Sequence, residues 1–252
     1  MLERTEKRNE WDLLIERFNT HKASNKIHPD AAVNTYVGWP TFLQQINFQA
    51  EFMGAKKCKI LDFGCGTGKF CKELYNMGYM VTGVDASQEM INFAKKNLPK
   101  KVKLIKIDLS QNKKAPSAYG NYFDIITAMH SWEWIENIET VIAKLAVMLK
   151  DNGIVIFSVF PKNHVVDSLI IKDLFENFDS PIDPHKGYVN FEGIKIPVYI
   201  RGAKYYERVM EKNGFTKILE SYPPYPLHFL KKYHWSGSKK PEMLIMSFRK
   251  TC

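Results

Sequence analysis

Between Cys58 and Phe160, short apolar runs alternate with stretches whose apolar residues recur at helical spacing. The runs read CKILDFG, YMVTGVDAS, VKLIKIDLS, YFDIITAM and GIVIFSVF, and one intervening stripe consists of Ile91, Ala94 and Leu98. Parallel strands need long crossovers, usually helical, so this alternation is typical of a mainly parallel sheet with helices on both faces. The sequence therefore predicts a doubly wound α/β fold.

The remainder of the chain departs from this alternation. Residues 161–201 are too long for an ordinary connection and predict an insertion that caps the substrate. GAKYYERVMEKNGF predicts a closing helix, and TKILESY and EMLIMSFRK predict two last strands. We expect no helix between these strands, and a direct link makes the final strand antiparallel. A single domain results, with a helical lid over 1–55, a cofactor-binding core over 56–160, the 161–201 insertion and a closing unit over 202–252.

The charge, cysteine content and hydropathy of the chain limit the partners, metal sites and location that we expect. The net charge of +9 favours anionic partners such as tRNA, although the lysine pairs are scattered and fit a solvated surface equally well. The four cysteines include no CxxC pair, so a structural zinc site is not expected. The N-terminus is too charged for a signal peptide, and no apolar run approaches the roughly 18 residues of a membrane helix. We expect a cytoplasmic protein that does not contact a membrane.

The stretch LDFGCGTGKF, residues 61–70, resembles a phosphate-binding loop but fails its pattern. Phe70 stands where a P-loop needs Ser or Thr, and Gly68 arrives one place early for the dinucleotide fingerprint. What remains is D-x-G-x-G-x-G after the first strand, with Asp85 at the end of the second. An acid in that position can accept hydrogen bonds from ribose hydroxyls. The pattern indicates a nucleoside-like ligand without a required phosphate anchor.

In this order of motifs, Cys58 to Phe160 resembles the class I S-adenosylmethionine-dependent methyltransferases, although Asp151-Asn152-Gly153 replaces the family's usual Pro-Gly-Gly turn. The resemblance implies a Rossmann-like sheet of seven strands with the last antiparallel, and S-adenosylhomocysteine as product. It implies that Asp62 holds the cofactor's amino end and that Asp85 binds its ribose, while Asp108 accepts from the adenine amine. The other cofactor-binding residues that it implies are Gly64, Cys65, Gly66, Gly68, Ala86, Met90, Leu109, Met129 and His130.

Candidate catalytic residues follow the fourth strand, in MHSWEWIEN. His130 is a candidate general base, or a histidine that only packs beside the cofactor. Glu133 is a candidate base or amine ligand, or a solvent-facing carboxylate. Trp134, like Trp132, is a candidate contact for a flat or cationic substrate, or a core residue.

Substrate specificity is expected outside the sheet. Tyr36 and Trp39 are the preferred lid contacts, and a closing lid excludes water. Arg201 either binds a substrate carboxylate bidentately or is structural.

The predicted reaction is methyl transfer to an oxygen or nitrogen atom of a small molecule by direct in-line displacement. The fourth strand lacks both the [DN]-P-P-[FY] and the Pro-Cys signatures of nucleic-acid methyltransferases, and the acids near it are too few for a metal site. A tRNA-modifying enzyme and a non-catalytic binding subunit remain as alternatives, because fold alone does not guarantee a reaction. The protein is expected to be a monomer or a homodimer.

Overall fold

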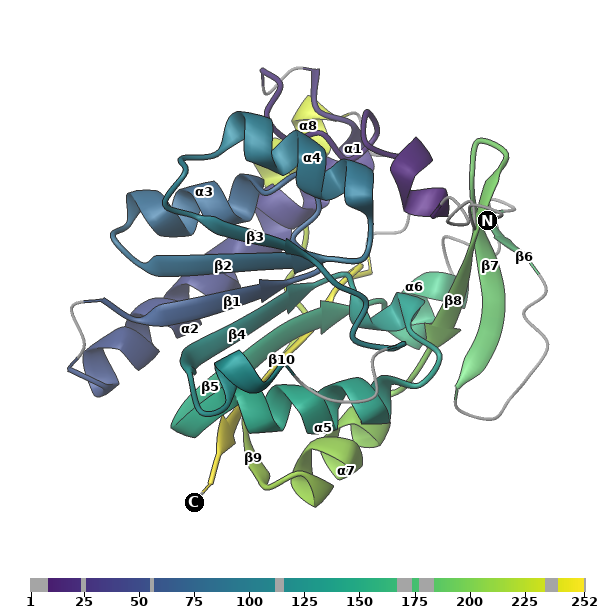
Figure 1. Cartoon of the computed structure of the whole chain (residues 1–252). Helices are drawn as coiled ribbons and strands as arrows, with labels where there is room; N and C mark the ends of the chain where they lie inside the picture. Colours follow the sequence, from purple (N-terminus) through teal and green to yellow (C-terminus); the bar gives the residue numbers. More distant parts are fainter. Residues whose placement is uncertain are drawn as a thin grey trace, which may run out of the picture.

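A seven-stranded sheet with the strand order β3-β2-β1-β4-β5-β10-β9 forms the centre of the molecule (Figure 1). The computed structural model describes residues 9–23, 26–54, 57–111, 116–166, 174–176, 184–233 and 240–251. The strands of this sheet are β1 (Lys59–Phe63), β2 (Met80–Asp85), β3 (Lys103–Lys106), β4 (Phe123–Met129), β5 (Leu149–Val159), β9 (Phe215–Ser221) and β10 (Leu244–Lys250).

The strand directions confirm the predicted fold class. β1 pairs in parallel with β2 and β4, and β4 pairs in parallel with β5. β10 is antiparallel to both β5 and β9. The expectation that no helix joins the last two strands was wrong, because α8 (Leu227–Lys232) begins directly after Pro226 and buries Phe229. Because β10 runs against its neighbours, it begins at the edge where the parallel strands end.

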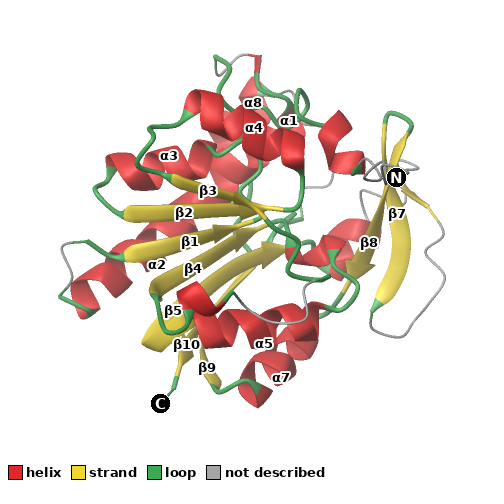
Figure 2. Ribbon diagram, viewed as in Figure 1, coloured by secondary structure: helices red, strands yellow, loops and turns green. Residues whose placement is uncertain are grey.

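Helices cover both faces of the sheet (Figure 2). α2 (Trp39–Phe52), α3 (Lys69–Asn76) and α4 (Gln88–Asn97) contribute to one apolar core, which includes Phe42, Ile46 and Leu74. α5 (Ile138–Met148) and α7 (Ala203–Lys212) contribute to the core of the other face, which includes Tyr206. The predicted helical lid over 1–55 thus differs from the structure in its second half, since α2 packs on the sheet.

Two added segments lie at the carboxyl ends of the parallel strands. The first holds η1 (Glu10–Leu13), α1 (Pro29–Val33) and the π-helical turn η3 (Asn34–Gly38). The second follows β5 and holds α6 (Lys162–His164) and an antiparallel sheet of β6 (Phe175–Glu176), β7 (His185–Phe191) and β8 (Ile194–Ile200), on the right in Figure 1. Leu14, Phe160 and Val198 join them in one apolar cluster. Short turns η4 (Ser117–Tyr119) and η5 (Trp132–Trp134) flank β4.

The insertion contains a hairpin that the sequence did not predict, and its residues 167–173 and 177–183 lie outside the described residues. β7 and β8 form a hairpin whose turn residues, Glu192 and Gly193, have φ of 55° and 95°. These angles suit a tight hairpin turn, in which glycine is favoured. Among the described residues, no helix has both the length and the apolar character needed to cross a bilayer.

Candidate active site

The glycine loop, residues 64–68, follows β1 and places backbone without side chains at the edge where the parallel strands end. Gly64 has φ of 70°, and a Cβ on it would lie 2.5 Å from the Cβ of Ser131. Gly66 has φ of 52°, and its Cβ position has no atom within 4 Å. Its N–H donates to Oδ2 of Asp85 over 2.8 Å. The loop therefore offers an open approach to its backbone at Gly66, while Gly64 permits close packing against the residue after β4.

Asp62 is buried beneath this loop. Its carboxylate accepts hydrogen bonds from the Cys71 thiol (3.2 Å) and the Thr127 hydroxyl (2.9 Å), and Thr127 pairs with Asp62 across β1 and β4. Burial, together with the nearby charge of Asp85, raises the pKa of Asp62 to about 6, against the lowering effect of the two hydrogen bonds. A cationic group bound here would stabilise the carboxylate.

Two further acids end the next strands. Asp85 is the last residue of β2, and its carboxylate accepts from the N–H groups of Gly66 and Ser87, over 2.8 and 2.9 Å. Burial raises the pKa of Asp85, although these backbone donors oppose the shift. Asp108 follows β3 and accepts from the backbone and hydroxyl of Ser110. Backbone donors thus fix both carboxylates before any ligand arrives.

His130 follows β4 in a left-handed conformation, with φ of 45°, that is uncommon for residues other than glycine. Its N–H donates to the carbonyl of Ser158, and its own carbonyl accepts from the Trp134 indole over 2.6 Å. Nδ1 lies 2.5 Å from Oε1 of Glu133, and within the described residues Nε2 has no hydrogen-bond partner. Burial lowers the pKa of His130, but the charge and hydrogen bond of Glu133, aided by Glu242, outweigh it and leave the pKa raised.

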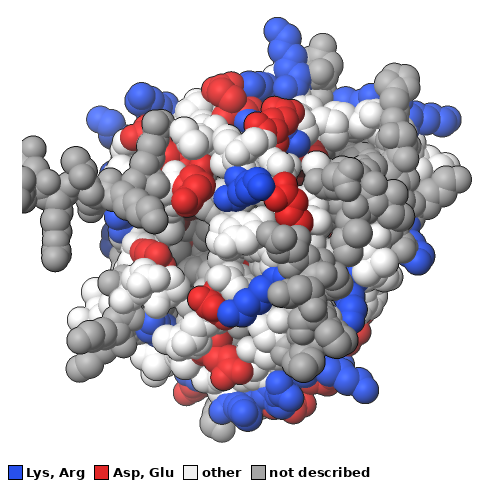
Figure 3. Space-filling view, turned by 90° about the vertical axis from the view of Figure 1, so that its right-hand side faces the viewer, with Lys and Arg blue, Asp and Glu red and all other residues white. Residues whose placement is uncertain are grey.

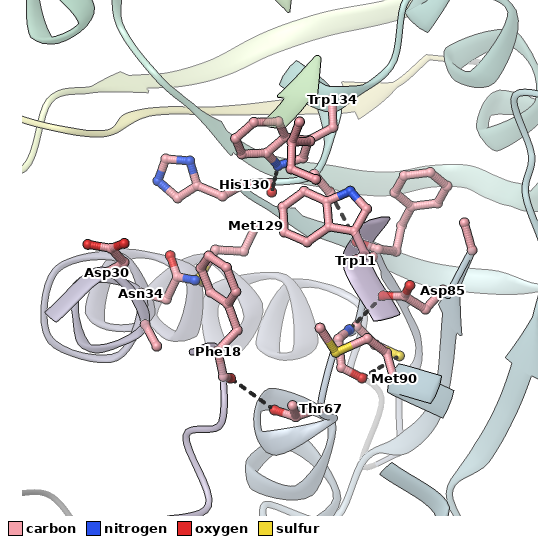
Figure 4. Close-up of a pocket in the computed structure, with 18 of the residues that line it drawn as sticks. Trp11, Phe18, Asp30, Asn34, Thr67, Asp85, Met90, Met129, His130 and Trp134 are labelled. Carbon is pink, nitrogen blue, oxygen red and sulfur yellow. Dashed lines mark hydrogen bonds between the residues drawn. The ribbon is translucent and has the colours of Figure 1, made fainter. Parts of the chain in front are cut away.

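The N-terminal segment closes over the glycine loop. The Asp12 carboxylate accepts from the Ser87 hydroxyl over 2.5 Å, and the Phe18 carbonyl accepts from the Thr67 hydroxyl over 3.4 Å. Trp11 packs edge-on against Trp134 with ring centroids 5.1 Å apart. Side chains from β2, β4 and the N-terminal segment therefore enclose one space (Figure 4).

That space is a cavity of about 1180 Å³. Figure 4 shows Asp85 and Met90 at one end of it, Asp30 and Asn34 at the other, and Phe18 and Met129 between. Most of the predicted site residues lie on its wall, namely Trp39, Asp62, Gly64, Cys65, Gly66, Asp85, Ala86, Met90, Asp108, Leu109, Met129, His130 and Trp134.

Four predicted site residues do not lie on the described wall. Glu133 is buried behind His130. Tyr36 packs against Phe229 and Tyr233, with ring centroids 6.1 and 6.0 Å apart, and does not line the cavity. Gly68 has φ of 80° and packs against α4, so it serves the turn into α3 rather than the wall.

Arg201 corrects the expectation of a substrate-binding arginine. It is 1% exposed, and its guanidinium donates to the carbonyls of Ile135 and Glu136 over 2.9 and 2.6 Å. Its charge is used inside the protein, where it ties the loop after β4 to the end of β8. Trp132 likewise belongs to the core, stacked on Phe157 with centroids 4.1 Å apart.

The structure adds residues that sequence reasoning did not single out. Glu242 precedes β10, lines the cavity and accepts from the Tyr225 hydroxyl over 2.8 Å. Burial raises its pKa to about 7, with His130 and Tyr225 lowering it and Asp30 and Glu133 raising it. Asp30 pairs with Arg17 over 2.8 Å. A usable signal for Glu242 existed, since an acid at the start of an antiparallel last strand lies at the edge where the parallel strands end.

Comparison with known proteins decides the family. The methyltransferase domain family matches residues 5–220. The chain belongs to this family. Solved structures with the same fold include S-adenosylmethionine-dependent methyltransferases, one of them bound to S-adenosylhomocysteine.

Individual relatives and solved structures are similar to this chain only at low sequence identity. The ubiquinone biosynthesis O-methyltransferase of Thiobacillus denitrificans is 28% identical over 124 residues, which are 49% of this chain and 52% of the relative. The chain thus spans about half the length of this curated relative. An S-adenosylmethionine-dependent methyltransferase structure from Listeria monocytogenes has a TM-score of 0.60 at 21% identity, covering 77% of this chain and 90% of that one. The 1,6-didemethyltoxoflavin-N1-methyltransferase of Burkholderia thailandensis, bound to S-adenosylhomocysteine, has a TM-score of 0.53 at 17% identity, covering 82% and 76%.

The residues of the site fit S-adenosylmethionine as a cofactor. The open Cβ position of Gly66 leaves room for a ligand beside the backbone, and three carboxylates end three successive strands of the sheet. Carboxylates accept from ribose hydroxyls and from amino groups, which are the donors that this cofactor carries. In the described part of the chain, no group of three or more His, Cys, Asp or Glu side chains is arranged to hold a metal ion.

Proposed function

We propose that this methyltransferase acts on an oxygen or nitrogen atom of a small-molecule acceptor by direct in-line displacement. The observation that carries the proposal is the single cavity that joins the three strand-end carboxylates to His130, whose Nε2 is unpartnered among the described residues. A cavity of this size suits a nucleoside cofactor together with a compact acceptor. The O-methyltransferase relative and the N1-methyltransferase structure support both kinds of acceptor atom.

For the cofactor, we propose the roles that the sequence predicts. Asp85 accepts hydrogen bonds from the ribose hydroxyls, Asp62 neutralises the amino end, and Asp108 binds the adenine amine, with Ala86, Met90 and Leu109 along the ring. Asp62 suits its role because its raised pKa reports a carboxylate short of positive charge. Bound S-adenosylmethionine supplies an activated methyl group, so the chain's own task is to position and desolvate the acceptor.

For the acceptor, we propose that His130 is the general base. When Nδ1 carries the proton and donates a hydrogen bond to Glu133, Nε2 has a free lone pair that we propose faces the acceptor. Nε2 then removes the proton from the acceptor hydroxyl or amine. Glu133 acts through His130 and is a positioning residue, since it fixes the ring and raises its pKa. Trp39 and Trp134 enclose the acceptor.

The acceptor class is tested with methyl-labelled S-adenosylmethionine and two fractions of a cell extract, the small molecules and the total tRNA. The proposal predicts label in the small-molecule fraction with the wild type and none with Asp85→Ala. Label in tRNA alone would contradict it. Acidic and basic side chains are interspersed on the described part of the face that contains the insertion (Figure 3), which does not favour a nucleic-acid surface there.

The role of His130 is tested once an acceptor is known. His130→Gln should lower kcat by about 10²- to 10⁴-fold, the usual contribution of a general base. Glu133→Gln should move the acid limb of the pH–rate profile to lower pH, because removal of the negative charge lowers the pKa of His130. An unchanged pH profile in Glu133→Gln would refute the pairing as a functional one.

A further inference from the structure

The acceptor end of the cavity carries one negative charge without a cationic partner in the described residues. His130 and Glu133 pair with each other, and Asp30 pairs with Arg17. Glu242 has Tyr225 as a neutral donor to Oε2, while Oε1 receives no hydrogen bond from the described residues. Glu242 is 9% exposed and lines the cavity. A buried carboxylate in this state is costly unless a ligand supplies the counter-charge.

Among the described residues of the wall, no Lys or Arg pairs with Glu242, and His130, whose charge lowers the pKa of Glu242, is itself paired with Glu133. Two of the described residues that line the cavity are Lys or Arg. Arg17 is held by Asp30 and also by Glu192 over 3.0 Å, and Lys69 is held by Glu73 over 3.0 Å. Within the described residues, no Lys or Arg of the wall is left to neutralise Glu242, and a bound cation would supply that charge.

Independent observations at the same end also indicate a ligand that donates hydrogen bonds. His130 is 10% exposed, its Nε2 is unpartnered among the described residues, and Figure 4 shows its ring directed toward the side of the cavity that holds Asp30 and Asn34. Oδ1 of Asn34 and Oγ1 of Thr35, from residues on the same wall, are buried without a described partner. Trp39 and Tyr233 also line the cavity, and aromatic faces attract cations.

We propose that Glu242 binds a protonated amine of the methyl acceptor, so that the substrates of this enzyme are amine-bearing small molecules. The inference rests on the proposed function, since it assigns an occupant to the acceptor end of the same cavity. In the proposed function the cofactor's amino group and ribose bind at the other end, to Asp62 and Asp85. Glu242 is therefore a specificity-determining residue rather than a cofactor ligand.

The experiment measures binding of matched probes by calorimetry at saturating S-adenosylhomocysteine. One set is tyramine, tyrosol and 4-hydroxyphenylacetate, and the second is tryptamine, tryptophol and indole-3-acetate. Each set keeps one aromatic frame and changes the side-chain end from amine to alcohol to carboxylate. The proteins are the wild type, Glu242→Gln and the control Glu211→Gln, whose side chain is exposed on α7.

We expect at least one amine to bind about tenfold or more tighter than its alcohol, with the carboxylate weakest, because a buried charge pair is worth several kcal/mol. Glu242→Gln should remove that preference and leave the affinity for S-adenosylhomocysteine unchanged, while Glu211→Gln should behave as the wild type. Failure of both amines to bind, or equal binding of amine and alcohol, would overturn the inference. So would a Glu242→Gln variant that loses S-adenosylhomocysteine, since Glu242 would then serve the cofactor. Absence of S-adenosylhomocysteine binding to the wild type would instead refute the proposed function, and this inference with it.

Discussion

Replacement of Glu242 by glutamine should stabilise the protein without ligand at alkaline pH and have a smaller effect at pH 5. Burial raises the pKa of Glu242 from 4.5 to about 7, so the folded state favours the protonated carboxyl. The stability that this preference contributes is fully present below pH 4.5 and is lost as pH rises through about 7. At pH 8 the buried carboxylate is ionised, and this lowers the free energy of unfolding.

The magnitude follows from the size of the shift. A rise from 4.5 to about 7 corresponds to about 3 kcal/mol of differential free energy, at about 1.4 kcal/mol for each pKa unit. Glutamine is neutral at every pH, and its carbonyl can still accept from the Tyr225 hydroxyl. The free energy of unfolding of Glu242→Gln should therefore exceed that of the wild type by about 1–3 kcal/mol at pH 8, and by about 1 kcal/mol or less at pH 5.

Urea unfolding, followed by tryptophan fluorescence at pH 5 and pH 8, measures this difference. Glu211→Gln is the matched control, because its side chain is exposed and it should change neither value. Some pH dependence should persist in Glu242→Gln, since the raised pKa values of Asp62 and His130 act in the same direction. Equal stability of Glu242→Gln and wild type at pH 8 would refute the reasoning that Glu242 is a buried charge without a cation.

Two further predictions concern residues whose roles the geometry separates. Gly64→Ala should destabilise the protein by about 3 kcal/mol or more, because it adds a clash with Ser131 to an unfavourable φ. Gly66→Ala should destabilise it by only about 1 kcal/mol, because only its φ is unfavourable. Urea unfolding of the two variants measures both values, and equal values would contradict the prediction. Arg201→Ala should lower the free energy of unfolding by about 2–4 kcal/mol through three lost carbonyl contacts and leave the affinity for S-adenosylhomocysteine unchanged. Loss of affinity without loss of stability would return Arg201 to a binding role.

The parts of the fold that rest on local patterns were predictable. Strands β1, β2 and β4 are apolar runs beside helices with clear stripes, and Asp62 and Asp85 stand at or near strand ends that the pattern itself locates. Parallel strands end at one edge of the sheet, so these acids had to converge there. The antiparallel direction of β10 was predicted correctly, although the link before it contains α8 and is not the helix-free connection that the prediction assumed.

The remainder depends on contacts between distant segments. The strand β8 reads IKIPVYI, an alternating pattern that a proline interrupts, and its hairpin was overlooked in the insertion. Arg201 carries no sequence mark that separates a carboxylate ligand from a residue that binds backbone carbonyls, since two of its three carbonyl partners lie more than sixty positions away. The pairing of His130 with Glu133 also needed coordinates, because it depends on the turn that η5 makes after His130.

The central claim is that the strand-end carboxylates form the cofactor site, and calorimetry of S-adenosylhomocysteine with wild type and Asp85→Asn tests it most directly. The amide keeps the shape of Asp85 but loses the charge that accepts from ribose hydroxyls, and hydrogen bonds to charged groups are worth about 1.5–3 kcal/mol. The account predicts one site in the wild type and an affinity about 10- to 100-fold weaker in Asp85→Asn, with both proteins folded by circular dichroism. Equal affinity in the two proteins would contradict it.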